Sequence, residues 1–412
     1  MTIGSSDGRF ADGPDSAYAW RRLLISLIIS TVGGIGMWST VVVLPTIQAE
    51  FDLDRGDASL PYFAVSLGFA GGGVLIGRLV DRFGIVLPLI GGSVVLGLGY
   101  IVAAGTQNLL QFTLVHGVLI AMFGAAVTFG PLVADVSHWF VRRRGIAIAI
   151  IASGNYLSGT IWPPLMQYGI DTVGWRQTHV AIGIICILVM VPLALLLRRP
   201  SPVAQVGPGH VAADRAPLPM SPGRLQVLLV VAALSCCIAM AMPQVHIVAY
   251  CGDLGFGAAR GAEMLSLMLG LGVVSRLISG AVADRIGGLW TLILGSTLQC
   301  LALVFYLPFD GLMSLYVVSG LFGLAQGGII PSYALIAREY FPAREAAQRI
   351  SLVLLAAVSG MAIGGWLSGE IYDYTGSYQA AFLNGIAWNI LNMAIAAWLL
   401  IGRNRTLSPG TA

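Results

Sequence analysis

One arginine lies inside a strongly apolar segment about two thirds of the way along the chain. Arg276 is the only charged residue of the stretch Gly270-Leu-Gly-Val-Val-Ser-Arg-Leu-Ile-Ser-Gly280. A charge at such a position is costly, so an ionisable side chain there usually faces a polar cavity. The guanidinium stays protonated, and its planar fork matches a carboxylate. We therefore expect Arg276 to bind a small organic anion.

A second set of polar side chains recurs at helical spacing. His246, Tyr250 and Asp253 stand at i, i+4 and i+7, so one face of a helix would present all three. Gln326 and Tyr333 share the i, i+7 spacing further along the chain. A carboxylate can take up a proton when its solvation changes, and histidine has an ordinary pKa near 6.5. Asp253 is therefore the first candidate for a proton-binding group, and His246 is the second.

Composition predicts that these residues belong to membrane-spanning helices. Hydrophobic residues make up 57% of the chain and charged residues only 10%, whereas a soluble domain carries about 25% charged residues. A spanning helix needs about 20 apolar residues, and lipid leaves an isolated segment no other way to satisfy its backbone. Twelve such stretches are expected, at about 20–47, 59–80, 85–105, 110–134, 144–167, 178–198, 224–251, 262–283, 288–307, 312–337, 346–370 and 379–402.

The placement of charge predicts the orientation of the chain. There is no lysine, so every fixed positive charge is an arginine. In a twelve-span arrangement most arginines of the loops and tails fall on one side, with Arg55, Arg176 and Arg260 as exceptions, and the opposite loops are mostly acidic. Cytoplasmic loops carry the basic excess. We therefore expect a protein of the cell (inner) membrane with both termini in the cytoplasm. The net charge of +3 reflects this bias and does not indicate a nucleic-acid partner.

Several classes of site are not indicated by the sequence. Residues 1–19 lack the basic and apolar regions of a cleavable signal peptide. The five cysteines and five histidines show no metal-ligand spacing, so we expect neither a metal nor a cofactor. No zinc-protease, serine-hydrolase or phosphate-loop motif is present, which argues against an enzyme and against ATP-driven transport.

The chain contains an internal repeat. Gly77-Arg-Leu-Val-Asp-Arg-Phe-Gly84 ends the second expected span, and Gly280-Ala-Val-Ala-Asp-Arg-Ile-Gly287 ends the eighth, 203 residues later. Two parallel six-helix bundles are the simplest explanation. We expect the first bundle within residues 1–198, a Pro/Gly/Ala-rich cytoplasmic linker at 199–223, and the second bundle within 224–412.

The doubled Gly-x-x-x-Asp-Arg-x-Gly turn resembles the loop motif of the major facilitator superfamily, although the final basic residue of that motif is missing in both copies. The resemblance covers nearly the whole chain. It implies that two bundles rock around a site at the membrane midplane. It also implies a gating role for the motif charges, which are Asp81, Arg82, Asp284 and Arg285 in this chain.

A narrower resemblance is to the monocarboxylate porter family. Trp139-Phe-Val-Arg-Arg-Arg-Gly-Ile-Ala-Ile-Ala-Ile-Ile-Ala-Ser-Gly154 is similar to that family's signature at the start of span five. Asp15-Ser-Ala-Tyr-Ala-Trp20 resembles its motif before span one, with Ser16 in place of the usual glycine. Pro243 to Gly255 is similar to a span-seven segment of bacterial members, and Arg276 stands where the family keeps a transport arginine. The resemblance implies transport of small monocarboxylates.

The sequence also departs from this family. Animal members use a lysine in span one, where this chain has Trp38, Ser39 and Thr40. They also keep an aspartate one turn before the span-eight arginine, where this chain has Gly272. Proton coupling must therefore be arranged differently here, and the bacterial branch suggests Asp253 together with Arg276.

Family architecture surrounds the central cavity with spans one, four, seven and ten. The substrate-binding candidates are then Arg276, His246, Tyr333, Gln326, Phe123 and Trp38. One fixed cation, a few hydrogen-bond donors and much apolar surface suit a short carboxylate.

The expected function is secondary active transport of lactate- or pyruvate-like monocarboxylates by alternating access, as proton symport. The expected partners are the organic anion, a proton and the lipid bilayer. Two alternatives stay open. An oxalate/formate-type exchanger would favour a second cation near the cavity, and the only candidate for it is a protonated His246. A non-transporting membrane sensor would normally need an output domain.

Overall fold

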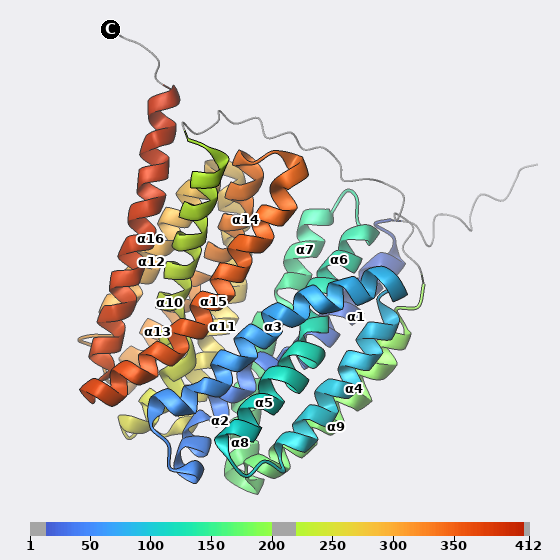
Figure 1. Ribbon diagram of the computed structural model, residues 1–412, viewed down its shortest axis with the longest axis vertical. Coiled ribbons are helices and arrows are strands. Elements are labelled where there is room, and N and C mark those ends of the chain that lie inside the picture. Colours follow the sequence, from blue (N-terminus) through green and yellow to red (C-terminus); the bar gives the residue numbers. More distant parts are fainter. Residues whose placement is uncertain (1–13, 200–219, 408–412) are drawn as a thin grey trace, which may run out of the picture.

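The chain folds as an all-helical membrane protein. The computed structural model describes residues 14–199 and 220–407. These residues form no β-strand, and twelve segments among them are long and apolar enough to cross a membrane (Figure 1). The predicted all-α fold with twelve spans is confirmed. Gly84 and Gly287 end the second and eighth spans at φ 74° and 86°, a left-handed backbone that favours glycine.

The first six spans form the N-terminal half. Several of them consist of more than one helical segment, and the helices in chain order are α1 (Ala17–Gly33), α2 (Ile35–Phe51), α3 (Arg55–Phe83), α4 (Val86–Ala103), α5 (Leu109–Leu114), the π-helix η1 (Val115–Gly124), the 3₁₀ turn η2 (Ala125–Thr128), α6 (Gly130–Trp139), α7 (Arg144–Ala152), α8 (Gly154–Val173) and α9 (Trp175–Leu195).

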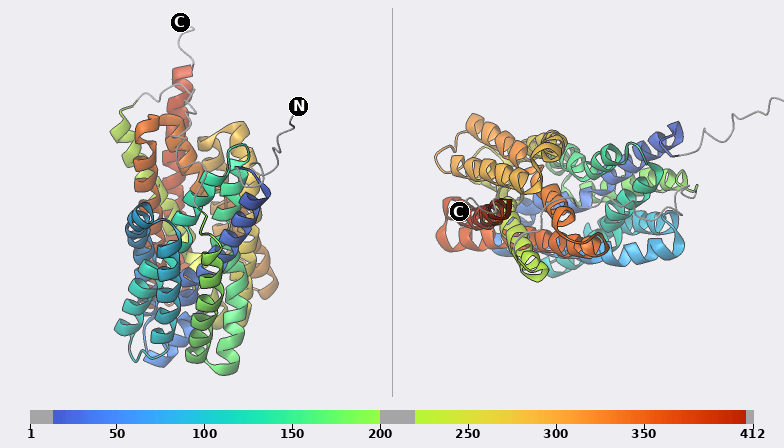
Figure 2. Two further views of the ribbon diagram at one scale, coloured as in Figure 1. Left: turned by 90° about the vertical axis from the view of Figure 1, so that its right-hand side faces the viewer. Right: turned by 90° about the horizontal axis from the view of Figure 1, so that it is seen from above.

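The last six spans form the C-terminal half, with α10 (Pro222–Asp253), α11 (Ala258–Ile286), α12 (Gly288–Phe305), α13 (Leu312–Gln326), α14 (Ile329–Tyr340), α15 (Ala343–Thr375) and α16 (Tyr378–Leu407). Most of the linker predicted at 199–223 lies outside the described residues. Seen from above, the two halves stand side by side (Figure 2).

Four spans are interrupted near their middle. Span one breaks at Gly34, span four at 124–129, span five at Ser153 and span ten at Gly327–Gly328. The break at Gly327 also brings two helices close together, because a Cβ there would lie 2.3 Å from the Gly272 carbonyl oxygen of α11. Helix ends leave backbone carbonyls without partners inside the helix. The interruptions therefore place backbone acceptors deep in the membrane.

Each half has its own hydrophobic core, and the cores merge on one side of the membrane. The described chain begins at α1 and ends at α16 on the same side, which we call the terminus side (Figures 1 and 2). Trp38, Val41, Leu44, Ala58 and Tyr62 of the N-terminal half belong to the core of the C-terminal half. Most of these residues lie toward the other side, which we call the opposite side. The two halves are thus packed together there.

Candidate functional site

Arg276 lies at the junction of the two halves. It stands ten residues before the end of α11, which places it about 15 Å into the span from the terminus side. Its Nη1 donates a 2.7 Å hydrogen bond to the carbonyl oxygen of Ala152 in the other half, and its Nε donates a 3.4 Å bond to that of Gly327. The guanidinium carbon lies 4.3 Å from the centre of the Tyr156 ring. The arginine therefore joins the breaks of spans five and ten.

The partners of Arg276 are electrostatically favourable but carry no full charge. Ala152 ends α7, and Gly327 follows the end of α13. The C-terminal end of a helix carries a partial negative charge, so both carbonyls attract the guanidinium. No described carboxylate pairs with Arg276, and Asp253 pairs with Arg55 instead. The site thus keeps a net positive charge at depth, which suits an anionic ligand.

Asp253 belongs to a cluster that fastens the two halves together on the opposite side. Nη2 of Arg55, at the start of α3, donates to both carboxylate oxygens of Asp253 at 3.0 and 3.1 Å. Its Nη1 donates to the Tyr378 hydroxyl at 3.0 Å. The Asp373 carboxylate accepts the backbone N–H groups of Arg55 and Gly56 at 2.8 and 2.6 Å. We call Arg55, Asp253, Asp373 and Tyr378 the latch.

His246 extends the latch into the C-terminal half. The residue is fully buried, and its Nε2 lies 2.7 Å from the Gly365 carbonyl oxygen. A carbonyl can only accept, so Nε2 carries the proton and Nδ1 accepts from the Tyr378 hydroxyl at 3.3 Å. Asp253 and His246 are therefore connected through Arg55 and Tyr378. Arg55, one of the exceptions in the charge pattern, was the sequence signal for this cluster, whereas nothing singled out Tyr378.

The remaining substrate-binding candidates lie on separate helices and share no hydrogen bond with one another. The Trp38 indole N–H donates to the Asn155 side-chain oxygen at 2.8 Å, one residue before Tyr156. Phe123 is half-buried within η1. Gln326 is buried and accepts a hydrogen bond from Gln244. Their roles in binding stay predictions.

Tyr333 is directed into the C-terminal half instead of the junction. It is fully buried, and its hydroxyl donates to Asn392 Oδ1 at 2.6 Å. In this conformation the residue contributes to packing of the bundle interior. Asn389 and Asn392 continue the same polar layer by donating to Ser296.

The predicted gating charges lie on the terminus side, away from the latch. Asp81, Arg82, Asp284 and Arg285 are all exposed, and none makes a hydrogen bond or ion pair with the described residues. Hydrogen bonds between the halves are made by Arg55 and Gly56 on the opposite side and by Ser266 and Arg276 of α11. The halves are thus fastened at the opposite side and at mid-depth, and this conformation leaves the motif charges unengaged.

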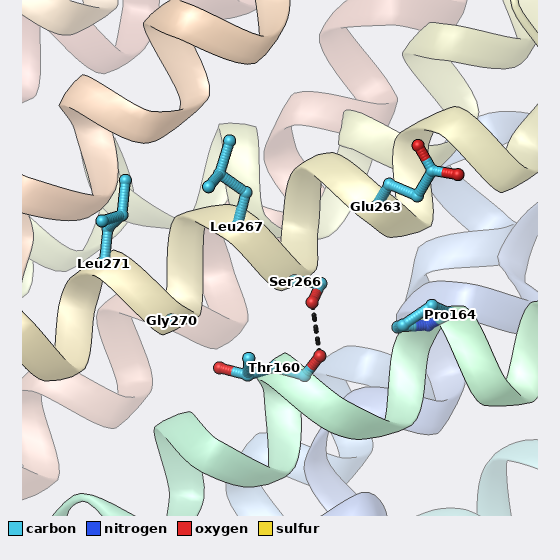
Figure 3. A pocket seen from close by; sticks show the side chains of 7 residues that line it. All are labelled: Thr160, Pro164, Glu263, Ser266, Leu267, Gly270 and Leu271. Atoms are coloured by element: carbon cyan, nitrogen blue, oxygen red, sulfur yellow. Dashed lines mark hydrogen bonds between the residues drawn. The ribbon is translucent and has the colours of Figure 1, made fainter.

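A surface groove runs along the contact between α8 and α11 (Figure 3). It measures about 390 Å³ and is lined by Thr160, Pro164, Glu263, Ser266, Leu267, Gly270 and Leu271. The Ser266 hydroxyl donates to the Thr160 carbonyl across it. Leu267 is 37% exposed, which places this groove on the outer surface of the helices. Arg276 does not line it.

Comparisons with known proteins agree with this architecture. The chain is 30% identical over 268 residues to the MFS-type transporter pynF of Aspergillus niger, covering 63% of this chain and 59% of that protein. It is 26% identical to Monocarboxylate transporter 13 of Bos taurus, covering 90% of this chain and 87% of that one. It is 25% identical to Monocarboxylate transporter 11 of Homo sapiens, covering 90% and 81%.

Solved structures share the fold. A bacterial homologue of the human lysosomal transporter Spinster superposes with a TM-score of 0.72 at 14% identity, covering 96% of this chain and 99% of that one. The nucleoside transporter NupG superposes with a TM-score of 0.70 at 13% identity, covering 92% and 99%. The family model "Major Facilitator Superfamily" matches residues 26–312 and 264–411. The chain is therefore a multi-pass membrane transporter, not an enzyme, and it belongs to the major facilitator superfamily.

Proposed function

We propose that this transporter carries small monocarboxylates, of the size of lactate or pyruvate, by alternating access coupled to protons. The termini lie in the cytoplasm, and the membrane is the cell (inner) membrane. The observation that supports this proposal most is Arg276, a deep guanidinium whose described partners are two backbone carbonyls and one aromatic ring. Relatives named as monocarboxylate transporters, matching 90% of the chain, favour the same substrate class.

Substrate binding would compete with a contact between the halves. The Ala152 carbonyl belongs to the N-terminal half, and Arg276 belongs to the C-terminal half. A carboxylate attracts a guanidinium more strongly than a neutral carbonyl does, and it accepts two parallel hydrogen bonds. An arriving monocarboxylate would therefore take Nη1 away from Ala152. The loss of that contact gives a physical link between binding and the relative motion of the halves.

Proton coupling would act through the latch. Protonation of Asp253 removes the charge that Arg55 neutralises, so the opposite side can open. His246 is connected to this pair through Tyr378 and supplies a second group for the same proton. Because Arg55 and Asp253 lie on different halves, the carboxyl has a different environment in the open state, as a proton carrier requires.

The test is uptake of labelled lactate, pyruvate, acetate and oxalate into proteoliposomes, with and without an imposed proton gradient. Arg276→Lys keeps the charge but loses the planar fork. The variant should weaken the interaction with the transported carboxylate, and with it uptake, by about 1.5–3 kcal/mol, the usual value of a charge-assisted hydrogen bond. Arg276→Ala should abolish uptake while the protein still folds. Arg260→Ala is the matched control, because Arg260 is exposed and pairs with Glu263, three residues along the same helix.

Two results would count against the proposal. Uptake of a monocarboxylate by well-folded Arg276→Ala would exclude binding by this guanidinium. Oxalate uptake that ignores the proton gradient but requires a counter-anion would identify an exchanger of the oxalate/formate type instead.

A further inference from the structure

The ring of Tyr156 lies against the guanidinium of Arg276 and comes from the other half of the protein. Tyr156 is the third residue of α8, just after the break at Ser153, and it is half-buried. The guanidinium carbon is 4.3 Å from the centre of the ring, within the range of about 6 Å over which an aromatic face attracts a cation. The ring therefore forms an apolar wall of the anion site.

Gly272 provides the space that this ring occupies. Gly272 stands one helical turn before Arg276, on the same face of α11. A Cβ on Gly272 would lie 2.5 Å from Cε1 and 2.7 Å from Cδ1 of Tyr156, which is far inside van der Waals contact. Its next contact would be the Gly323 carbonyl oxygen, at an ordinary 3.7 Å. The Tyr156 ring alone would therefore obstruct a methyl group at this position.

Close packing of α8 against α11 holds the ring in place. One turn further along α8, a Cβ on Gly159 would lie 2.2 Å from Cδ1 of Leu269. The Ser266 hydroxyl donates a hydrogen bond to the Thr160 carbonyl oxygen across the same contact. The Tyr156 side chain itself packs against the hydrophobic core of the C-terminal half. The position of the ring is thus determined by contacts on several sides, and not by Arg276 alone.

The contacts of Arg276 determine where a carboxylate can bind. Its Nε and Nη1 atoms donate to the carbonyl oxygens of Gly327 and Ala152, and the Tyr156 ring lies against the guanidinium. A carboxylate that replaces Ala152 would place its oxygens about 2.7–2.9 Å from the guanidinium nitrogens. The bound carboxylate, and the first atoms of the tail that it carries, would then lie beside the ring.

We propose that Tyr156 sets the size limit of the substrate, and that Gly272 is the residue that makes room for it. The ring fills the space beside the guanidinium that the tail of a larger acid would need. A short aliphatic tail, such as that of lactate or pyruvate, does not need this space. The inference rests on the proposed binding of monocarboxylates at Arg276, and it narrows the substrate class to short aliphatic acids without a ring.

Removal of the ring would leave a space that suits an aromatic group. An apolar cavity of about 150 Å³ inside a protein can bind benzene. Tyr156→Ala opens such a space against a guanidinium, so an acid that carries its own phenyl ring can restore both the packing and the attraction between ring and cation. Phenyllactate is lactate with a phenyl group on its methyl carbon. The two acids therefore differ only in the group that the new space would accept.

The test is uptake of labelled lactate and phenyllactate into proteoliposomes. The wild type should take up lactate and exclude phenyllactate. Tyr156→Ala should shift the ratio of the two uptake rates toward phenyllactate by about tenfold or more, because the fit of even one methylene group in a pocket changes selectivity by about 10–200-fold. Tyr156→Phe keeps the ring and should still exclude phenyllactate. Tyr168→Ala is the matched control, since Tyr168 lies on the same helix and is 72% exposed.

The possible failures of this test can be told apart. Uptake of phenyllactate by the wild type, or an unchanged ratio in folded Tyr156→Ala, would overturn the size limit and leave binding at Arg276 intact. A wild type that takes up neither acid would refute the proposed function and this inference with it. If Tyr156→Ala does not fold, Tyr156→Leu also removes the ring but keeps more apolar bulk, and the same shift in the ratio is expected.

Thermal unfolding in detergent tests the pairing of the ring with Gly272 without any substrate. Gly272→Ala should lower the unfolding temperature, because the added methyl group meets the ring. In the Tyr156→Ala background the same substitution should be neutral or stabilising, because the clash is gone and alanine is favoured over glycine inside a helix. Substitutions that share a contact are not additive. Additive effects of the two changes would show that the ring does not fill the space beside Gly272, and would refute the size limit.

Discussion

Removing the ion pair between Arg55 and Asp253 should shift the transporter toward opening on the opposite side. Arg55→Met keeps an apolar stem between Tyr372 and Tyr378 but loses the charge. In the native pair, the Arg55 side chain is 7% exposed and the Asp253 side chain is 33% exposed. Exposed pairs contribute about 0–1 kcal/mol, and breaking a fully buried pair costs about 3–5 kcal/mol. We expect an intermediate coupling of about 1.5 kcal/mol, a roughly tenfold change in the open population.

The assay is a double-mutant cycle read through a buried cysteine. In a background without the five native cysteines, Ala58→Cys places a thiol beside the latch, at a position where the native alanine is 3% exposed in the core that both halves share. Its rate of reaction with a small thiol reagent reports opening. Ala103→Cys, fully buried in the core of the N-terminal half, is the control for general unfolding.

Four proteins complete the cycle, namely the wild type, Arg55→Met, Asp253→Asn and the double variant. Each single variant should accelerate labelling at residue 58, and the double variant should accelerate it little further. Additive effects, within about 0.5 kcal/mol, would mean that the two charges do not act as a pair. Equal acceleration at residue 103 would show unfolding instead of opening. Either result would refute the latch as a conformational switch.

Three further predictions concern Asp81, Asp15 and the orientation of the chain. Asp81→Asn should slow exchange between conformations while equilibrium binding of substrate stays nearly intact, because this charge is exposed and makes no hydrogen bond or ion pair with the described residues. A large loss of affinity at an unchanged exchange rate would contradict this prediction. Asp15 should fasten the N-terminal motif only while ionised. Slight burial raises its pKa, but the N–H groups of Val141, Arg142 and Arg143 outweigh this and hold the pKa below its usual value, so the contact is present above about pH 4 and lost as the pH falls through the lowered pKa. Hydrogen exchange at these three amides should show that loss, and Asp15→Asn should show it at every pH. Finally, Gly209→Cys should react with an impermeant reagent in inside-out vesicles only, and Ala259→Cys in intact cells only; the reverse pattern would invert the orientation.

The architecture was predictable from sequence because it depends on local properties. Spans follow from runs of apolar residues, and the repeated turn at Asp81 and Asp284 predicts two halves. The breaks were not predictable to the residue. Gly34 and Gly327 stand among many glycines that have no such role, and Ser153 stands beside one more glycine, Gly154.

The candidate site was predictable only in part. Arg276 could be identified because a charge in an apolar span is exceptional. Its partners are backbone carbonyls, which no sequence pattern marks. Asp253 could be identified by its spacing on one helix face, but its partner Arg55 is distant along the chain. Tyr333 shows the limit of such spacing arguments, because span ten is interrupted at Gly327–Gly328, between Gln326 and Tyr333. Gln326 contacts Gln244, whereas Tyr333 contacts Asn392.

The interrupted spans have a mechanical consequence. A span made of two shorter rods bends most easily at the joint between them, and α7–α8 and α13–α14 have their joints beside the same guanidinium. A ligand held at a pivot changes the side it faces while its own displacement stays small. We therefore expect Arg276 to stay bound to one anion throughout the change between the two conformations, so that the anion is not transferred between successive sites.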